Sequence, residues 1–262
     1  MSLVREHAAE QYKDSANLES RINIYNYGTN SEPWHKWVFS QVAIEPGDIL
    51  LEFGCGNGQL WAANAARIPE EARIILSDNS PAMIQAAKEK LASLKYRFPF
   101  MDLDIEGELP FDDGTFDYVI ANHMLYHVVD IDTAIKGVRR ILKPTGTFFV
   151  ATNRSDHLKE MKKLFLEFDD GLVYPVDLEE RFNLGSGGAY LERYFSRVVV
   201  REYENLLRIN KPDPIIQYAL SIFTSGQLTG RLDWLRDFLQ RKIEEFGAIE
   251  ITPKSGIFLA SA

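Results

Sequence analysis

The segment from Ile49 to Gly58 constrains the fold more than any other part of this 262-residue chain. It reads ILLEFGCGNG, an apolar strand that runs through an acid into three glycines at alternate positions. Glycine adopts positive φ without strain and leaves no side chain between the backbone and a ligand. The pattern predicts a buried strand followed by a turn that closely approaches a bound molecule.

The spacing of the glycines limits which class of ligand the turn is expected to bind. A dinucleotide-binding turn needs a third small residue three positions after its second glycine. Here Gly54 and Gly56 put Gln59 at that position, and Gly58 comes one residue early. An acid two residues before a G-x-G-x-G turn instead resembles the opening motif of the class I S-adenosylmethionine-dependent methyltransferases.

A second apolar strand, Ala72 to Asp78, also ends in an acid. In a parallel sheet Asp78 emerges at the same edge as the glycine turn, where its carboxylate can accept both hydroxyls of a ribose. Ser80 and Pro81 then provide a cap and a first-turn proline for a helix with Met83 on its apolar face. Core packing and contact with adenine are equally good interpretations of Met83.

The third strand, which we expect from Tyr96 to Met101, leads to two acids and then to the sequences LPF (109–111) and DGTFD (113–117). This combination resembles the same methyltransferases, in which an acid after the third strand binds the adenine amino group. The resemblance assigns Asp102 to that role and places Leu103 beside the ring. Asp104 is the alternative, because the spacer before LPF is a residue or two longer than usual. A solvated loop carboxylate is the plain interpretation of either acid.

The fourth strand, Phe116 to Ala121, continues into NHMLYHV (122–128), which in the resembling family lies at the methyl-transfer end of the pocket. We expect Asn122 to contact the cofactor and His127 to face the acceptor and take up a proton. His123 and Tyr126 are expected to shape the acceptor pocket. Capping or core packing is the alternative role for these histidines.

The two histidines of this segment also have a spacing that suits zinc on a helix. The glutamate of the H-E-x-x-H motif is missing, because Met124 occupies its position. No other cysteine or histidine cluster completes a zinc site. The sequence therefore predicts no metal.

Strands and helices alternate five times up to Thr152, which predicts an α/β fold with a doubly wound parallel sheet and ligands at its carboxyl edge. The resemblance implies a Rossmann-like, mostly parallel, seven-stranded sheet with helical lid insertions after the fifth and sixth strands. We expect residues 47–153 and 194–262 to form this core.

The remaining segments are expected to cover the site. By resemblance, residues 1–46 form a helical arm over the cofactor, and residues 154–193 and 212–230 form inserted substrate lids. The plain alternatives are a packed surface helix and connectors without a binding role.

Composition excludes several classes of protein. The net charge of −9 argues against a broad nucleic-acid surface, because duplex binding depends on lysine and arginine at phosphates. No apolar run approaches the ~18 residues that span a bilayer, and the amino end lacks an apolar signal core. The single cysteine, Cys55, excludes an internal disulfide. These features predict a cytoplasmic protein without membrane contacts, and they do not indicate an oligomeric state.

Together the motifs predict an enzyme, a methyltransferase that uses S-adenosyl-L-methionine to methylate a nitrogen or oxygen of a small molecule. Two alternatives remain, a nicotinamide-dependent oxidoreductase on the same sheet and a non-catalytic S-adenosylmethionine-binding protein. The expected cofactor contacts are Glu52, Gly54, Cys55, Gly56, Asn57, Asp78, Asn79, Met83, Asp102, Leu103 and Asn122.

Overall fold

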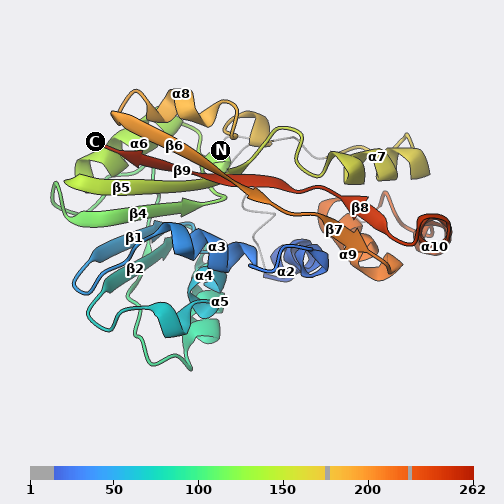
Figure 1. Cartoon of the computed structure of the whole chain (residues 1–262), viewed down its shortest axis with the longest axis horizontal. Coiled ribbons are helices and arrows are strands. Elements are labelled where there is room, and N and C mark those ends of the chain that lie inside the picture. The colour runs from blue at the N-terminus through green and yellow to red at the C-terminus, as the bar shows by residue number, and fades with distance from the viewer. Residues whose placement is uncertain (1–14, 175–177, 224–225) are drawn as a thin grey trace.

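A single seven-stranded sheet forms the centre of the computed structural model, which describes residues 15–174, 178–223 and 226–262 (Figure 1). Its strand order is β3-β2-β1-β4-β5-β9-β6. The first five strands in the chain are parallel, and β9 is antiparallel to β5 and β6. The predicted doubly wound, mostly parallel sheet is confirmed. The strands are β1 (Ile49–Phe53), β2 (Arg73–Asp78), β3 (Phe100–Asp102), β4 (Phe116–Asn122), β5 (Leu142–Asn153), β6 (Arg197–Glu204) and β9 (Lys254–Ser261).

Helices cover both faces of this sheet because alternate strand residues point to opposite sides. In β1, Leu50 packs with one buried cluster, whereas Leu51 and Phe53 pack with another. The first cluster lies under α3 (Trp34–Gln41), α4 (Gln59–Ala62), η2 (Ala65–Arg67) and α5 (Pro81–Leu91). The second lies under η3 (Leu125–His127), α6 (Ile131–Ile141), η4 (Leu178–Glu180) and α8 (Gly187–Leu191).

A second lobe with its own buried cluster lies beyond the carboxyl ends of the parallel strands, on the right in Figure 1. Its short antiparallel sheet pairs β7 with β8. The cluster is centred on Leu207, Ile215 and Leu235. The lobe comprises α2 (Ser15–Asn23), η1 (Ile24–Tyr27), α7 (Lys159–Phe168), β7 (Leu207–Ile209), α9 (Pro212–Ile222), α10 (Leu232–Phe246) and β8 (Ile249–Ile251).

Two prolines explain where strand boundaries differ from the sequence-based prediction. The third strand was expected from Tyr96, but Pro99 lacks a backbone donor and β3 begins at Phe100. Near the end of the sequence, within the segment 194–262 that was expected to belong to the core, β8 and β9 lie in different sheets, and Pro253 stands between them.

The expected lids are distributed between the two parts of the molecule. The segment 154–193 contributes α7 to the second lobe and α8 to a face of the main sheet, and the segment 212–230 contributes α9 to the lobe. The residues 1–46 arm contributes α2 and η1 to the lobe and α3 to the sheet.

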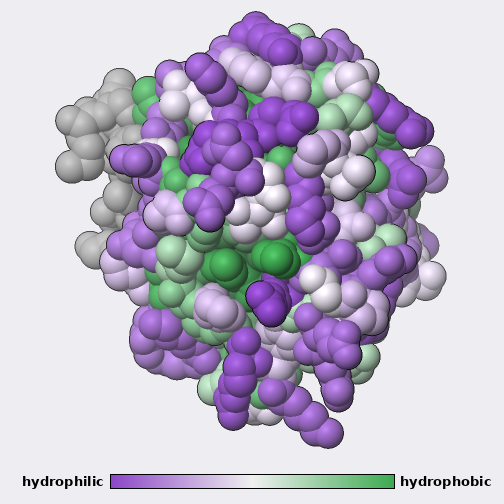
Figure 2. Space-filling view, turned by 90° about the vertical axis from the view of Figure 1, so that its left-hand side faces the viewer, coloured by the Kyte–Doolittle hydropathy of each residue, from purple (hydrophilic) through white to green (hydrophobic). Residues whose placement is uncertain are grey.

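At the opposite edge of the main sheet, the described residues form no comparable covering lobe. Figure 2 faces this edge, and the surface there is mostly hydrophilic with one small hydrophobic area near its middle. Within the described ranges, no helix has the length and apolar character needed to cross a membrane.

Candidate functional site

A cavity of about 1180 Å³ lies between the carboxyl edge of the main sheet and the second lobe. Residues from β1, β2 and β4 line it on one side, and residues from α2, α7 and α9 line it on the other. Small-molecule sites typically enclose roughly 300–1,000 Å³. The cavity therefore has room for two ligands side by side.

The glycine turn after β1 adopts the expected backbone conformation. Gly54, Gly56 and Gly58 have φ of 66°, 54° and 75°. A Cβ at Gly54 would lie 2.9 Å from the Cβ of Met124, whereas a Cβ at Gly56 would meet only the Leu18 side chain of α2, at 3.6 Å. The turn thus presents bare backbone to the cavity, and α2 lies close above it.

Glu52 is buried at the end of β1, where its carboxylate accepts a hydrogen bond from Trp61 Nε1 at 2.5 Å. Burial raises the pKa of Glu52 to about 8. The hydrogen bond from Trp61 acts to lower this pKa, and the charge of Asp78 acts to raise it. The carboxyl group is therefore largely protonated at neutral pH. A cation bound nearby would favour its ionised form.

Asp78 is buried at the end of β2, and each of its two carboxylate oxygens accepts a hydrogen bond from the backbone of a neighbouring turn. Oδ2 accepts from the amide of Gly56 and Oδ1 from the amide of Ser80, both at 2.9 Å. Burial is the main reason that its pKa lies above the usual value. The carboxylate thus links the glycine turn to the start of α5 at the cavity wall.

The two acids after β3 occupy different places. Asp102 pairs in register with Asp78, but it is exposed and does not line the cavity. Leu103 and Asp104 do line it. Of the two acids considered from the sequence, Asp104 is thus the one at the cavity wall. The longer spacer before LPF was the sequence signal for this alternative.

The segment after β4 reaches the cavity as expected, because Asn122, His123, Tyr126 and His127 all line it. The Oδ1 atom of Asn122 is buried and has no hydrogen-bond partner among the described residues. His123 has φ of 56°, a strained value for a residue other than glycine. Burial lowers its pKa to about 3, with smaller effects from His157 and His35. The other expected cofactor contacts that line the cavity are Cys55, Asn57, Asn79 and Met83.

Sequence analysis missed His157, which follows β5 and lines the same cavity. Its Nε2 lies 2.9 Å from the hydroxyl of Tyr25 in η1. Its Nδ1 lies 3.0 Å from the amide nitrogen of Lys254 and 3.2 Å from the carbonyl oxygen of the same residue. Burial lowers the pKa of His157 to about 4, so the imidazole is neutral at pH 7.

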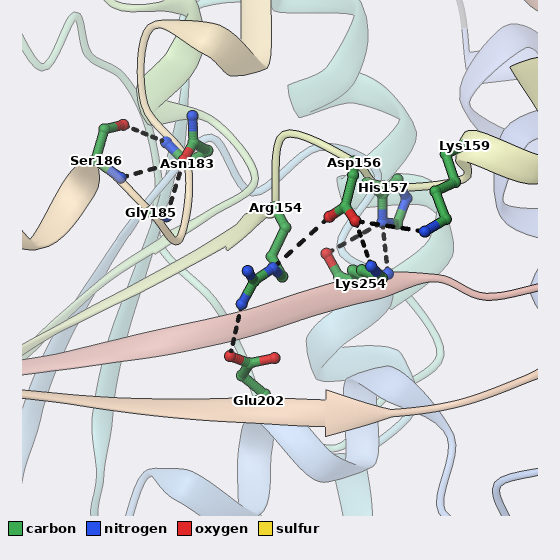
Figure 3. Close-up of polar contacts among 9 residues, drawn as sticks. All are labelled: Arg154, Asp156, His157, Lys159, Asn183, Gly185, Ser186, Glu202 and Lys254. Carbon is green, nitrogen blue, oxygen red and sulfur yellow. Dashed lines mark hydrogen bonds and ion pairs between the residues drawn. The ribbon is translucent and has the colours of Figure 1, made fainter.

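Ion pairs fix the loop that carries His157 (Figure 3). Asp156 pairs with the side chain of Lys254 and lies 3.7 Å from Arg154 Nε. Arg154 also pairs with Glu202 of β6 at 3.2 Å. The imidazole is therefore held at a defined position between the main sheet and the second lobe.

The four histidines within the described ranges all line this cavity, namely His35, His123, His127 and His157. Burial also lowers the pKa of His35, to about 4. Despite this gathering, the described residues contain no group of three or more His, Cys, Asp or Glu side chains arranged to hold a metal ion.

The central part of the chain matches a known family. Residues 51–150 match a family model described as a methyltransferase domain. In this part the chain is similar to S-adenosylmethionine-dependent methyltransferases, as the sequence motifs indicate. The cofactor of such a domain is S-adenosylmethionine, in agreement with the glycine turn and with Asp78 at the adjacent strand end.

Similar proteins support the same family. They match only part of this chain, which limits how much of their function can be inferred for it. A demethylmenaquinone methyltransferase of Symbiobacterium thermophilum is 31% identical over 45% of this chain and 47% of its own length. The ubiquinone/menaquinone biosynthesis C-methyltransferase UbiE of Teredinibacter turnerae is 30% identical over the same shares. The chain therefore spans about half the length of these relatives.

A solved structure shows that the fold extends over the whole chain. Phosphoethanolamine N-methyltransferase 2 of Haemonchus contortus has a TM-score of 0.60 and 15% sequence identity, and the match covers 100% of this chain and 60% of its own. The methyltransferase-domain match ends within β5, so α7, α9 and His157 lie outside it. The cofactor half of the cavity thus belongs to the family domain, whereas most of the facing wall does not.

Proposed function

We propose that this chain transfers the methyl group of S-adenosylmethionine to a small aromatic acceptor. One observation carries the proposal: a single cavity joins the glycine turn and Asp78 to a wall rich in aromatic side chains. Aromatic side chains stack against flat ligands at little entropic cost. Those that line the cavity are Tyr25, Trp34, Phe53, Tyr126, Tyr174, Tyr203 and Tyr218.

For the cofactor, we propose that Asp78 accepts the ribose hydroxyls and that Asp104 accepts the adenine amino group. The glycine turn and Glu52 would surround the methionine part, with Asn122 offering its buried, unpartnered carbonyl oxygen. A buried acceptor of this kind gains most when a ligand donor reaches it.

Asp104→Ala is expected to weaken S-adenosylhomocysteine binding by roughly ten- to hundredfold, because a hydrogen bond to a charged acceptor is lost. Asp102→Ala is the matched control, since Asp102 is exposed and lies outside the cavity wall. It should change the affinity by less than about threefold. Isothermal titration calorimetry on both variants decides between the two acids, and the reverse ranking would restore Asp102.

For the acceptor atom, we propose carbon in place of the nitrogen or oxygen that was expected from the sequence. The relatives from Symbiobacterium and Teredinibacter support this change, because the latter is named a C-methyltransferase and both names refer to quinone compounds. The aromatic cavity wall supports an acceptor ring. An electron-rich ring carbon could take the methyl group once a ring hydroxyl has lost its proton, with the methyl–sulfur bond breaking to leave a neutral thioether. The same ring carbon would then lose its own proton and the ring hydroxyl would regain one, so that one proton is released in total.

The residues of the chain would hold the two ligands in line and accept these protons. When bound, S-adenosylmethionine supplies a methyl group activated by a positively charged sulfur. Enclosing the acceptor between the main sheet and the second lobe would exclude water and fix its orientation. The hydroxyl–imidazole pair of Tyr25 and His157 provides a path for a proton from the cavity to a fixed, neutral base.

Tyr25→Phe and His157→Gln are expected to reduce turnover by about 10²-fold or more while leaving cofactor affinity within about threefold. His127→Ala is the comparison, because His127 also lines the cavity and was the base expected from the sequence. Steady-state kinetics on the three variants separates the candidates. A larger loss in His127→Ala than in His157→Gln would assign the proton transfer to His127.

The proposed function itself is tested with S-adenosylmethionine that carries a deuterated methyl group. The protein is incubated with fractionated small-molecule extract, and mass spectrometry searches for a compound that gains one CD₃ group. Cofactor binding without any labelled product would favour the non-catalytic alternative. Tight NAD binding without binding of the adenosyl ligands would favour the oxidoreductase.

A further inference from the structure

We propose that Arg21, Lys162 and Tyr174 form an anion-binding subsite at the second-lobe end of the cavity, which takes a carboxylate or phosphate group of the acceptor. The identity of the bound molecule as a methyl acceptor rests on the proposed function. The subsite itself rests on two buried polar atoms without a hydrogen-bond partner among the described residues, Arg21 Nε and the Tyr174 hydroxyl, and on the distribution of charge in the cavity.

Arg21 provides the first observation. Its guanidinium is anchored by a hydrogen bond from NH2 to the carbonyl oxygen of Ser221 in α9, at 2.8 Å. Its Nε is buried and has no hydrogen-bond partner within the described residues, and Arg21 forms no ion pair with them. Arg21 is partly buried, and a buried Nε donor without an acceptor or a nearby counter-charge is unfavourable unless a ligand anion reaches it. Since Arg21 lines the cavity, a ligand can supply that anion.

Tyr174 provides the second observation. Its hydroxyl is buried and has no hydrogen-bond partner among the described residues. Its ring packs edge-on against Phe223, with the ring centroids 5.0 Å apart. Burial, with a smaller contribution from Tyr218, raises the pKa of Tyr174, so the hydroxyl keeps its proton as a donor. A neutral donor next to a cation is suited to an anionic oxygen.

Lys162 adds a second cation to the cavity wall, beside Tyr174. Its Nζ lies 5.4 Å from the centroid of the Tyr174 ring, and Lys162 also lines the cavity. It forms no ion pair with the residues that the structure describes. Its side chain is exposed, so solvent screens its charge more than that of Arg21.

The charges of the described residues that line the cavity are unevenly distributed, with Lys36 of α3 the cation on the main-sheet side. Among the described residues that line it, the four carboxylates all lie at the carboxyl edge of the main sheet: Glu52, Asp78, Asp104 and Glu106. The lining residues contributed by α2, α7 and α9 include Arg21 and Lys162 and no acid. An acceptor with an anionic tail would therefore enter with its tail toward the lobe. Its reactive ring would then point toward the cofactor half, which is the orientation that methyl transfer needs.

The experiment measures binding of three probes of similar size to the full chain, with and without S-adenosylhomocysteine. Phenylacetate carries a carboxylate, phenyl phosphate carries a phosphate, and phenylacetamide is neutral. We expect calorimetry to show that at least one of the anions binds about tenfold more tightly than the amide. The ranking of the two anions distinguishes a carboxylate-bearing from a phosphate-bearing acceptor.

Variants then locate the subsite. Arg21→Gln is expected to weaken binding of the preferred anion by roughly ten- to hundredfold and Tyr174→Phe by roughly three- to tenfold. Lys162→Gln should weaken it by roughly two- to fivefold, because the lysine is exposed. Binding of the amide and of S-adenosylhomocysteine should stay unchanged in all three variants.

Lys163→Gln is the matched control, since Lys163 is the exposed neighbour of Lys162 on α7 and does not line the cavity. It should bind the anions as the parent does. Equal binding of amide and anions by the parent, or equal effects of Lys162→Gln and Lys163→Gln, would overturn the proposal. The probes are also titrated without S-adenosylhomocysteine, so the two proposals are tested separately. A failure of cofactor binding would contradict the proposed function, whereas the anion titrations would still test the subsite.

Discussion

Asp78→Ala is expected to weaken S-adenosylhomocysteine binding by roughly thirty- to thousandfold. The estimate follows from the loss of two hydrogen bonds to a charged acceptor, about 2–4 kcal/mol in total. The substitution also removes the acceptor of the Gly56 amide, which lies at the surface of the cofactor turn. An effect on the shape of the turn therefore adds to the direct loss of ligand contacts.

Calorimetric titration of the variant and the parent measures this loss, and a thermal melt shows whether the variant is folded. Asp78→Asn provides a second comparison, because it keeps the size of the side chain and removes its charge. An unchanged dissociation constant in folded Asp78→Ala would exclude Asp78 from the binding site.

The cofactor half of the site could be predicted because its determinants are local in the sequence. A strand, an acid and the glycines of the turn fall within ten consecutive residues, and φ of 54–75° at Gly54, Gly56 and Gly58 matches the expectation for that turn. Parallel pairing then brings the end of β2 to the same edge without further information. The shift from Asp102 to Asp104 needed coordinates, because a loop after a short strand has no periodicity that fixes its register.

The second lobe could not be predicted because its contacts join distant parts of the chain. Leu207 pairs with Ile251, and the hydrogen bond between Tyr25 and His157 joins residues 132 positions apart. His157 lies in the polar sequence NRSDHLKE, which reads as an ordinary surface loop. Its burial and its ion-paired surroundings arise only when η1, β6 and β9 meet around that loop.

Acidification below pH 6.5 is expected to destabilise the folded protein steeply. Folding lowers the pKa of His35 to about 4, of His123 to about 3 and of His157 to about 4, against an ordinary value of 6.5. The unfolded chain therefore binds more protons than the folded one below pH 6.5. Their contribution to stability is fully present above that pH and is lost as the pH falls toward 4.

Glu52 changes the stability of the folded protein with pH in the opposite direction. Its pKa is raised to about 8 in the folded protein, so its contribution is fully present below pH 4.5 and is lost as the pH rises through 8. Each group changes the free energy of unfolding by at most about 1.4 kcal/mol per pH unit, in the pH range where it is protonated in one state of the protein and deprotonated in the other. Between pH 6 and 5 three histidines oppose one carboxyl group, which gives a net loss of about 2–3 kcal/mol per pH unit. Above pH 6.5 only Glu52 of these four titrates, so stability should be greatest near that pH.

Urea denaturation at pH 8, 6.5, 6 and 5 measures this profile directly, at constant ionic strength. His123→Asn is the informative variant, because asparagine tolerates the positive φ at this position and does not titrate. Its free energy of unfolding should fall about 1 kcal/mol less than that of the parent between pH 6 and 5. Stability that is constant from pH 6.5 to 5 in the parent would mean that the folded protein binds as many protons as the unfolded chain, which contradicts the lowered pKa values of the cavity histidines. In that case burial would not keep the imidazole of His157 neutral, and the proposed role of His157 as a fixed, neutral base would be lost.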